Sequence, residues 1–271
     1  GRAAGGGGAA GGGGGGGVKG GGGGGGGGGT PGSLSATPEQ TPTEKLGHVK
    51  VRVRPVAELE KLWDTVGTMA RAKASIWAPT AHLERASLRV CVGHYASPSF
   101  EPPHKAKARP GGGKEGRGKE GQLELIDTQL RWLQTSSWLQ AAVDRFLPPP
   151  VRLTQAWCKR SGRLALYAWE AVPPEGYVAL GMLCSTSEAP PPVESIRCVP
   201  LRWVCPSSTP PQKVWDDAGS SGTQGSIWIV NNLRLIAVSA GHDAPAGPFY
   251  ELRADHFAIA ELLAADAGAD A

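Results

Sequence analysis

The chain has 271 residues, and its 28 Lys and Arg against 24 Asp and Glu leave a formal net charge of +4. No run approaches the roughly 18 consecutive apolar residues of a membrane-spanning helix, which excludes an integral membrane protein built on such helices. The composition also excludes a collagen and a disulfide-dense secreted mini-domain. No signal peptide is visible, and a start at Gly1 favours a fragment or a processed product.

The first 47 residues are predicted to lie outside the folded core. Residues 1–32 hold 23 of the chain's 41 glycines and almost nothing that could be buried, so we expect this segment to be disordered. Residues 33–47 are rich in Pro, Thr and Ser and are typical of a linker. The sequence pattern then changes: Val49, Val51 and Val53 alternate with basic residues, which predicts a half-buried strand.

The excess positive charge lies in residues 105–121, a Gly-rich segment with six basic and two acidic side chains. A solvated loop explains this composition better than a contact with nucleic acid or anionic lipid. We therefore expect no nucleic-acid partner.

A helical stretch follows this loop. Leu123, Ile126, Leu130 and Leu133 recur at intervals of three and four residues, and residues 138–146 continue the pattern. This spacing predicts two helices with a break near residues 135–137. Three prolines at 148–150 end the second helix, because proline fixes φ and removes a hydrogen-bond donor.

These changes in composition divide the chain into six segments. They are a disordered segment and linker at 1–47, a first β repeat at 48–103, a charged loop and helical insertion at 104–147, a second β repeat at 148–204, a third β repeat at 205–253, and an Ala/Asp-rich tail at 254–271. The predicted fold is mainly β, with repeated antiparallel β units in a sandwich-like or prism-like arrangement. Asp255 and His256 are expected in a terminal helix.

An internal repeat is the main signal in the sequence. Each β segment contains a Trp, a turn with Gly and Ser or Thr, a second Trp 12 to 14 residues later, and then a further Gly. The predicted core positions of the repeat are Trp63, Trp77 and Gly93; Trp157, Trp169 and Gly181; and Trp215, Trp228 and Gly241.

The tryptophans of the repeat can be explained in two ways. Two indoles in each unit, at on the order of 200 Å² apiece, would dominate the core of a unit of about 55 residues, which needs its neighbours for stability. Exposed indoles could instead stack on sugars or lie in a membrane interface. The matched positions favour core packing, and Trp132 and Trp138, outside the repeat, are the better candidates for surface contacts.

The second repeat resembles a known family. Residues 168–181 read AWEAVPPEGYVALG, which is similar to the element SIWRPVPPPGYVALGD of the vacuolar protein sorting-associated protein 62 domain. This element is also repeated in some members of the vacuolar protein sorting-associated protein 13 family. The resemblance continues through the prolines at 190–192, the IRCV at 196–199 and the VWDDAGS at 214–220. It departs from the family at Glu170, Ala171 and Met182.

The resemblance implies a module without catalytic activity. The 13 family comprises long, rod-like lipid conduits at organelle contact sites, with all-β regions that bind adaptors and membranes. The resemblance therefore implies an interaction or targeting module at cytosolic membrane faces. Its implied partners are protein adaptors and membrane lipids, and no cofactor is implied.

Candidate catalytic residues are few. His94 and His242 each follow a Gly, and Asp243 lies beside the latter, but a structural role at a strand end explains the pair better than acid–base chemistry. Asp64, Asp216 and Asp217 follow the first Trp of their units and favour turns over metal binding. Ser161–Gly162 and residues 220–222 lack the frame of a nucleophile elbow, and the five cysteines lack zinc spacing.

The sequence therefore predicts an interaction and targeting module of a vacuolar protein sorting-type protein, cytoplasmic and peripheral to organelle membranes. The site residues are structural, with no catalytic, cofactor or metal site. The alternative is a lectin-like or membrane-binding β module related to pore-forming proteins. A hydrolase that uses His242 and Asp243 is a third class, which loss of activity in His242→Ala would reveal.

Overall fold

The computed structural model describes residues 48–80, 83–84, 86–105, 120–128, 138–220 and 222–263. The chain divides into two compact units, Gly1–Glu39 and Gln40–Ala271, and all described residues belong to the second. The predicted disordered start and most of the charged loop lie outside the described residues. Within them strands dominate, so the prediction of a mainly β fold is confirmed.

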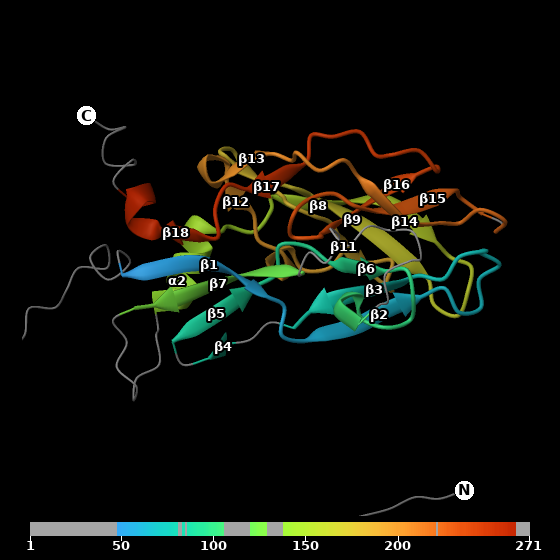
Figure 1. The fold of residues 1–271 in the computed structure, drawn as a ribbon, viewed down its shortest axis with the longest axis horizontal. Helices are drawn as coiled ribbons and strands as arrows, with labels where there is room; N and C mark the ends of the chain where they lie inside the picture. The colour runs from blue at the N-terminus through green and yellow to red at the C-terminus, as the bar shows by residue number, and fades with distance from the viewer. Residues whose placement is uncertain are drawn as a thin grey trace, which may run out of the picture. The chain divides into compact units, whose positions relative to one another are not determined.

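Three antiparallel sheets of three strands each form the larger part of the fold (Figure 1). In each sheet the strand that comes second in the chain is the central one. We call the three sheets units one, two and three. They consist of β2 (Leu59–Asp64), β3 (Ser75–Pro79) and β6 (Tyr95–Ser97); β8 (Arg152–Lys159), β9 (Leu166–Val172) and β11 (Leu183–Ser185); and β14 (Gln212–Asp216), β15 (Gly225–Ile229) and β16 (Ile236–Ala240).

The three units share the same irregularity in strand pairing. The register of the first strand with the second shifts just before the first Trp of each unit, at Trp63, Trp157 and Trp215. Such a bulge adds one residue and turns the following side chain relative to the sheet. Because the bulge recurs at the same place, residues can be matched between units: the second tryptophans, Trp77, Trp169 and Trp228, fall on equivalent positions of the central strands.

A closed ring of backbone hydrogen bonds joins the third strands. His94 N–H donates to the carbonyl of Met182 at 3.0 Å, and Met182 N–H donates to that of Ile236 at 3.0 Å. Ile236 N–H returns to the carbonyl of His94 at 3.1 Å. A ring of three equivalent bonds requires the units to surround a common pseudo-threefold axis, so the arrangement is a prism rather than a sandwich.

A five-stranded antiparallel sheet accompanies the prism. Its strand order is β18-β1-β7-β5-β4. The strands are β1 (Val49–Pro55), β4 (Leu83–Glu84), β5 (Ser87–Val90), β7 (Gly121–Asp127) and β18 (His256–Ala258). The alternation at Val49 to Val53 therefore does mark a strand, but β1 pairs with β7 and β18 and not with the strands of unit one.

Two helical predictions are wrong. Residues 121–127 form the central strand β7 and not a helix, since Leu123 and Leu125 are buried against the core while Glu124 faces the other side of the sheet. His256 lies in strand β18 and not in a terminal helix. The second predicted helix is confirmed as α2 (Trp138–Phe146), which buries Leu139, Ala142, Val143 and Phe146.

Short elements complete the fold. Two antiparallel pairs join β10 (Tyr177–Val178) to β12 (Val199–Pro200), and β13 (Val204–Pro206) to β17 (Tyr250–Leu252). The 3₁₀ turns are η1 (Pro103–Lys105), η3 (Val193–Ser195) and η4 (Leu201–Trp203). One core cluster joins the five-stranded sheet and α2 to prism residues such as Tyr95 and Leu235, and a second fills the prism around Trp63, Trp157 and Trp215.

Candidate functional site

The first tryptophan of each unit lies in the interior of the prism. Trp63, Trp157 and Trp215 are all buried. The ring of Trp215 contacts the other two edge-on, with centroid distances of 5.8 Å to Trp63 and 6.4 Å to Trp157. Such edge-to-face contacts add to the gain from burial of the indoles. The three indoles therefore form the centre of the prism core.

The polar ends of these three indoles connect the units in a second ring. Trp63 Nε1 donates to the carbonyl of Leu164 at 3.0 Å, Trp157 Nε1 to those of Gln224 at 2.9 Å and Thr223 at 3.3 Å, and Trp215 Nε1 to that of Ala72 at 3.1 Å. The acceptors Ala72, Leu164 and Thr223 hold matching positions in the turns between the first and second strands. Each unit is thereby tied to the next around the axis.

The second tryptophans are also buried, and each donates its Nε1 proton to a serine. Trp77 bonds Ser75 Oγ and Trp228 bonds Ser226 Oγ, both at 2.8 Å. Tyr167 holds the equivalent position in unit two, and Trp169 donates instead to Ser185 Oγ of the facing strand at 2.9 Å. The six repeat indoles are thus core residues in matching environments. Trp138 is half-buried, and Trp132 lies outside the described residues.

The third landmark of the repeat behaves differently. Gly93 and Gly181 lie at matching positions, where a Cβ on Gly93 would come within 3.0 Å of the Gly181 Cα. Gly241 does not join them. It lies just after β16 with open space around it, and Leu235 occupies the matching position, its side chain filling the space that the two glycines leave.

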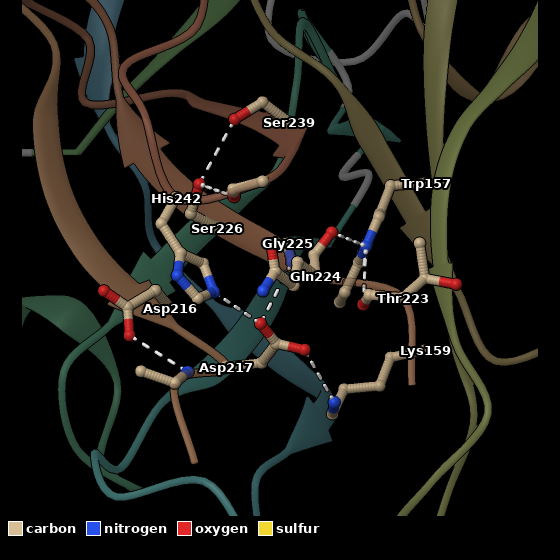
Figure 2. A network of polar contacts seen from close by, with 12 residues as sticks. Trp157, Lys159, Asp216, Asp217, Thr223, Gln224, Gly225, Ser226, Ser239 and His242 are labelled. Carbon is tan, nitrogen blue, oxygen red and sulfur yellow. Dashed lines mark hydrogen bonds and ion pairs between the residues drawn. The ribbon is translucent and has the colours of Figure 1, made fainter. Parts of the chain in front are cut away.

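A buried polar network joins units two and three at one end of the prism (Figure 2). The residue two places after the first Trp is Thr65 in unit one, Lys159 in unit two and Asp217 in unit three. Lys159 Nζ lies 3.0 Å from Asp217 Oδ2, and the two side chains are only 2% and 1% exposed. The position that Thr65 holds in unit one is therefore occupied in units two and three by the two members of an ion pair.

The other carboxylate oxygen of Asp217 is also engaged. Asp217 Oδ1 accepts the backbone N–H of Gly225 at 3.0 Å and lies 2.8 Å from His242 Nε2 (Figure 2). Burial raises the pKa of Asp217, but the bonds with His242, Gly225 and Lys159 outweigh this and hold the pKa below its usual 3.8. Asp217 is therefore a fixed, fully bonded anion, which suits it to holding units together rather than to accepting a proton.

The turn interpretation is confirmed for Asp64 and Asp216 but is wrong for Asp217, whose side chain bonds Lys159, Gly225 and His242 instead. Asp64 Oδ1 accepts the N–H of Val66 at 3.1 Å, and Asp216 Oδ1 accepts that of Ala218 at 3.2 Å. Both are Asx turns, in which the side chain stands in for a backbone acceptor. Within the described part of the chain, no group of three His, Cys, Asp or Glu side chains could hold a metal ion.

From the sequence, His94 and His242 were expected to hold equivalent positions in the repeat. In the structure they do not. His94 is buried just before β6, the third strand of unit one, and its equivalents are Met182 and Ile236, whereas His242 follows β16. The Nδ1 atom of His94 accepts the N–H of Cys184 at 3.0 Å. Burial lowers the pKa of His94 to about 4, so this imidazole is neutral near pH 7.

A groove of about 450 Å³ opens beside units two and three. Its walls come from the 170–182 segment, which carries the family resemblance, and from 248–250. They include Glu170, Tyr177, Leu201, Phe249 and Tyr250, of which Leu201 is an exposed aliphatic side chain. The groove is a concave, largely apolar surface that these segments offer to a ligand.

A second charged cluster, on the five-stranded sheet, was missed from the sequence. The buried carboxylate of Glu124 on β7 lies 2.7 Å from Arg52 Nε, 3.5 Å from Arg54 Nε and 3.5 Å from Arg89 Nε. Burial raises the pKa of Glu124, but Arg52, Arg89 and the Ser87 hydroxyl outweigh it, so the pKa of Glu124 is lowered. The alternation of basic residues in β1 was a signal for this face, but its partner strand had been assigned to a helix.

Comparison with known proteins gives a family and a fold. The sequence matches the family "Vacuolar protein sorting-associated protein 62" over residues 41–241. It is also similar to the structure titled "Crystal structure of GNIP1Aa from Chromobacterium piscinae", with a TM-score of 0.53 and 15% identity over 83% of this chain. The chain spans 40% of the length of that protein, and at this identity the likeness concerns the fold alone.

No curated protein matches the sequence. Among the described residues, no helix has the length and apolar character needed to span a bilayer. The family match covers about three quarters of the chain and nearly all of the three-unit prism. The chain therefore belongs to the vacuolar protein sorting-associated protein 62 family.

Proposed function

We propose that this chain is a non-enzymatic interaction and targeting module of a vacuolar protein sorting-type protein that takes part in lipid transfer and protein sorting at organelle membranes. The observation that carries the proposal is the family match over residues 41–241, which runs from before β1 to the end of β16. In this proposal the chain acts in the cytoplasm, peripheral to the membrane, and binds protein adaptors.

The state of the candidate catalytic groups supports a role in binding. His94 is buried and accepts a backbone N–H through Nδ1. Asp217 has both carboxylate oxygens engaged by Lys159, Gly225 and His242. Proton transfer in catalysis needs a group that is within reach of a substrate and free to change its protonation state. These side chains instead contribute to the stability of the prism.

We assign adaptor binding to the groove beside units two and three. Aromatic side chains such as Tyr177, Phe249 and Tyr250 are enriched in protein interfaces, because they bury a large area at a small entropic cost. Leu201 is an exposed aliphatic residue at this groove that an apolar side chain of a partner could cover. The occupant in this proposal is a segment of an adaptor protein with apolar side chains.

The test is the location of the full chain in cells, followed as a fluorescent fusion. We expect the wild-type chain to collect on an organelle membrane and Leu201→Arg to become diffuse, because a charge in the groove opposes docking of an apolar segment. Val151→Arg is the matched control: Val151 is also an exposed aliphatic residue but is not part of the groove wall. A diffuse wild-type chain would contradict the proposal.

The lectin-like alternative has its own readout. Specific binding of the purified chain to members of a glycan array, without recruitment to any organelle, would favour that alternative over adaptor binding. Hydrolase activity lost in His242→Ala would favour an enzyme.

A further inference from the structure

One end of the prism gathers the three turns that connect the first and second strands of the units. We call residues 65–73, 160–165, 218–220 and 222–224 the prism tip; Figure 1 shows the β2–β3, β8–β9 and β14–β15 connections at the right-hand end. The turns touch one another: Arg163 N–H donates to the carbonyl of Val66 at 3.3 Å. A Cβ on Gly219 would lie 3.1 Å from Arg71 Nε.

The prism tip exposes large apolar side chains. Met69 is 78% exposed, Val66 43% and Leu164 41%. The described residues contain two other exposed large aliphatic side chains, Val151 and Leu201, and neither belongs to the tip. Single exposed apolar residues are common, but three on adjoining turns form a patch, and such patches mark interaction sites.

Positive charge surrounds this apolar patch. The tip segments contain Arg71, Lys73, Arg160 and Arg163 and no Asp or Glu. Arg160 is paired with Glu188, and Lys73 lies over the ring of Phe100 at 5.3 Å from its centroid. Arg71 and Arg163 are exposed and have no acidic partner among the described residues. The surface that complements the tip is therefore apolar inside and negatively charged around its edge.

The turns of the tip are held in place from below. Thr68 Oγ1 and N–H both bond the carbonyl of Thr65, at 2.8 and 3.1 Å. Trp63 and Trp215 donate to the carbonyls of Leu164 and Ala72, and the Lys159–Asp217 pair lies directly beneath. A preorganised surface loses little conformational entropy when it binds.

We propose that the prism tip is a membrane-contact surface that inserts Met69, with Val66 and Leu164, into the headgroup region of a bilayer containing anionic phospholipid, while Arg71 and Arg163 pair with the negatively charged headgroups. Apolar side chains flanked by cations are the composition that lies stably at this boundary. This inference rests on the proposed function, because both place the chain at a membrane. The inference adds that the prism tip is the surface that contacts the lipid, and that the lipid must carry a net negative charge.

The experiment is flotation of the purified full chain with phosphatidylcholine vesicles, with and without phosphatidylserine. We expect binding only when phosphatidylserine is present. Arg71→Ala combined with Arg163→Ala should lower the partition coefficient about 30-fold, since each cation near an anionic surface contributes about 1 kcal/mol. Met69→Glu should lower it about tenfold or more, because it removes buried apolar area and adds repulsion.

Val151→Glu is the matched control, because it places the same charge at an exposed aliphatic position outside the tip. Normal binding by this variant, with loss in the tip variants and unchanged circular dichroism in all, would support the proposal. Equal binding to neutral vesicles would overturn it, and so would unchanged binding by the tip variants. If the wild-type chain binds no vesicle, the inference fails, although recruitment in cells through an adaptor can still support the proposed function. If vesicles bind but no organelle recruits the chain, the proposed function fails instead.

Discussion

The prism and the five-stranded sheet are built in opposite ways. In the prism, β2 and β3 belong to one hairpin of 21 residues, Leu59 to Pro79, and the other two units repeat this local plan. In the sheet, Val51 faces Leu125 on one side and Phe257 on the other, so its neighbours come from distant parts of the chain. Local pairing leaves a repeated pattern in the sequence, whereas long-range pairing leaves none.

The two regions also differ in how they treat charge. The prism buries one ion pair, Lys159 with Asp217, almost completely. The sheet surrounds Glu124 with arginines that remain partly exposed to solvent. A buried pair depends on both partners and is little affected by salt, whereas an exposed cluster is screened. Variants in the two regions should therefore respond differently to truncation, pH and salt.

The largest effect is expected from truncation of the central indoles. Trp215→Ala should lower the free energy of unfolding by about 4 kcal/mol, the cost of a large cavity in a packed core. Trp63→Ala and Trp157→Ala should cost the same within about 1 kcal/mol, because the three indoles hold equivalent positions. Guanidinium unfolding followed by circular dichroism measures this. A cost well below the others for any one of them would break the equivalence of the units.

The next effect separates the units from one another. Asp217→Ala should cost about 3 kcal/mol, because it leaves Lys159 charged and buried. The matched change in unit one, Thr65→Ala, should cost only about 1 kcal/mol, because it removes the hydrogen bond that Thr65 Oγ1 accepts from Ala74 N–H. The combination of Lys159→Met with Asp217→Leu should recover much of the loss. Equal costs for the two single variants would show that the ion pair is not what joins units two and three.

The third prediction concerns pH. The pKa of His94 is lowered from 6.5 to about 4, so its contribution to stability is complete above pH 6.5 and is lost as the pH falls towards 4. Linkage gives a loss of about 2 kcal/mol between pH 6.5 and about pH 5. His94→Gln should flatten the profile of unfolding free energy in this window. An unchanged slope in that variant would assign the acid sensitivity to other groups.

The smallest effect is expected in the five-stranded sheet. Glu124→Gln should cost about 1 kcal/mol at low salt, because partial exposure of the arginines weakens each interaction. The cost should shrink as salt is added, whereas the cost of Asp217→Ala should stay constant. Unfolding at low and high sodium chloride measures both. A salt-independent cost for Glu124→Gln would remove the proposed difference between the two regions.

The prism was largely predictable from the sequence, and the rest was not. The paired tryptophans recur because each unit places one indole in the centre of the prism and a second on its own central strand. Their spacing in the sequence therefore predicted the three units. Gly241 was wrongly matched to Gly93 and Gly181, because in unit three the space on the axis is filled by Leu235 and no glycine is needed there. The true equivalence depends on contacts across the axis, which sequence order does not reveal.

The five-stranded sheet escaped prediction for a different reason. Leu123 and Ile126 fit a helical period, and only the partners of β7 on both sides decide for a strand. The tertiary context overrode a weak local pattern. The Lys159–Asp217 pair was missed because its partners are 58 residues apart and neither is unusual in its own segment.

The closed bonding of His94, Met182 and Ile236 restricts how such a protein can change its size. A chain with one unit deleted would leave one donor and one acceptor facing solvent along an open seam. A chain with a fourth unit would have to widen the axis and empty the space around Leu235. We therefore expect larger relatives to contain a second complete set of three units after the first. They can also enlarge by insertions between strands, such as the one that supplies β7 and α2.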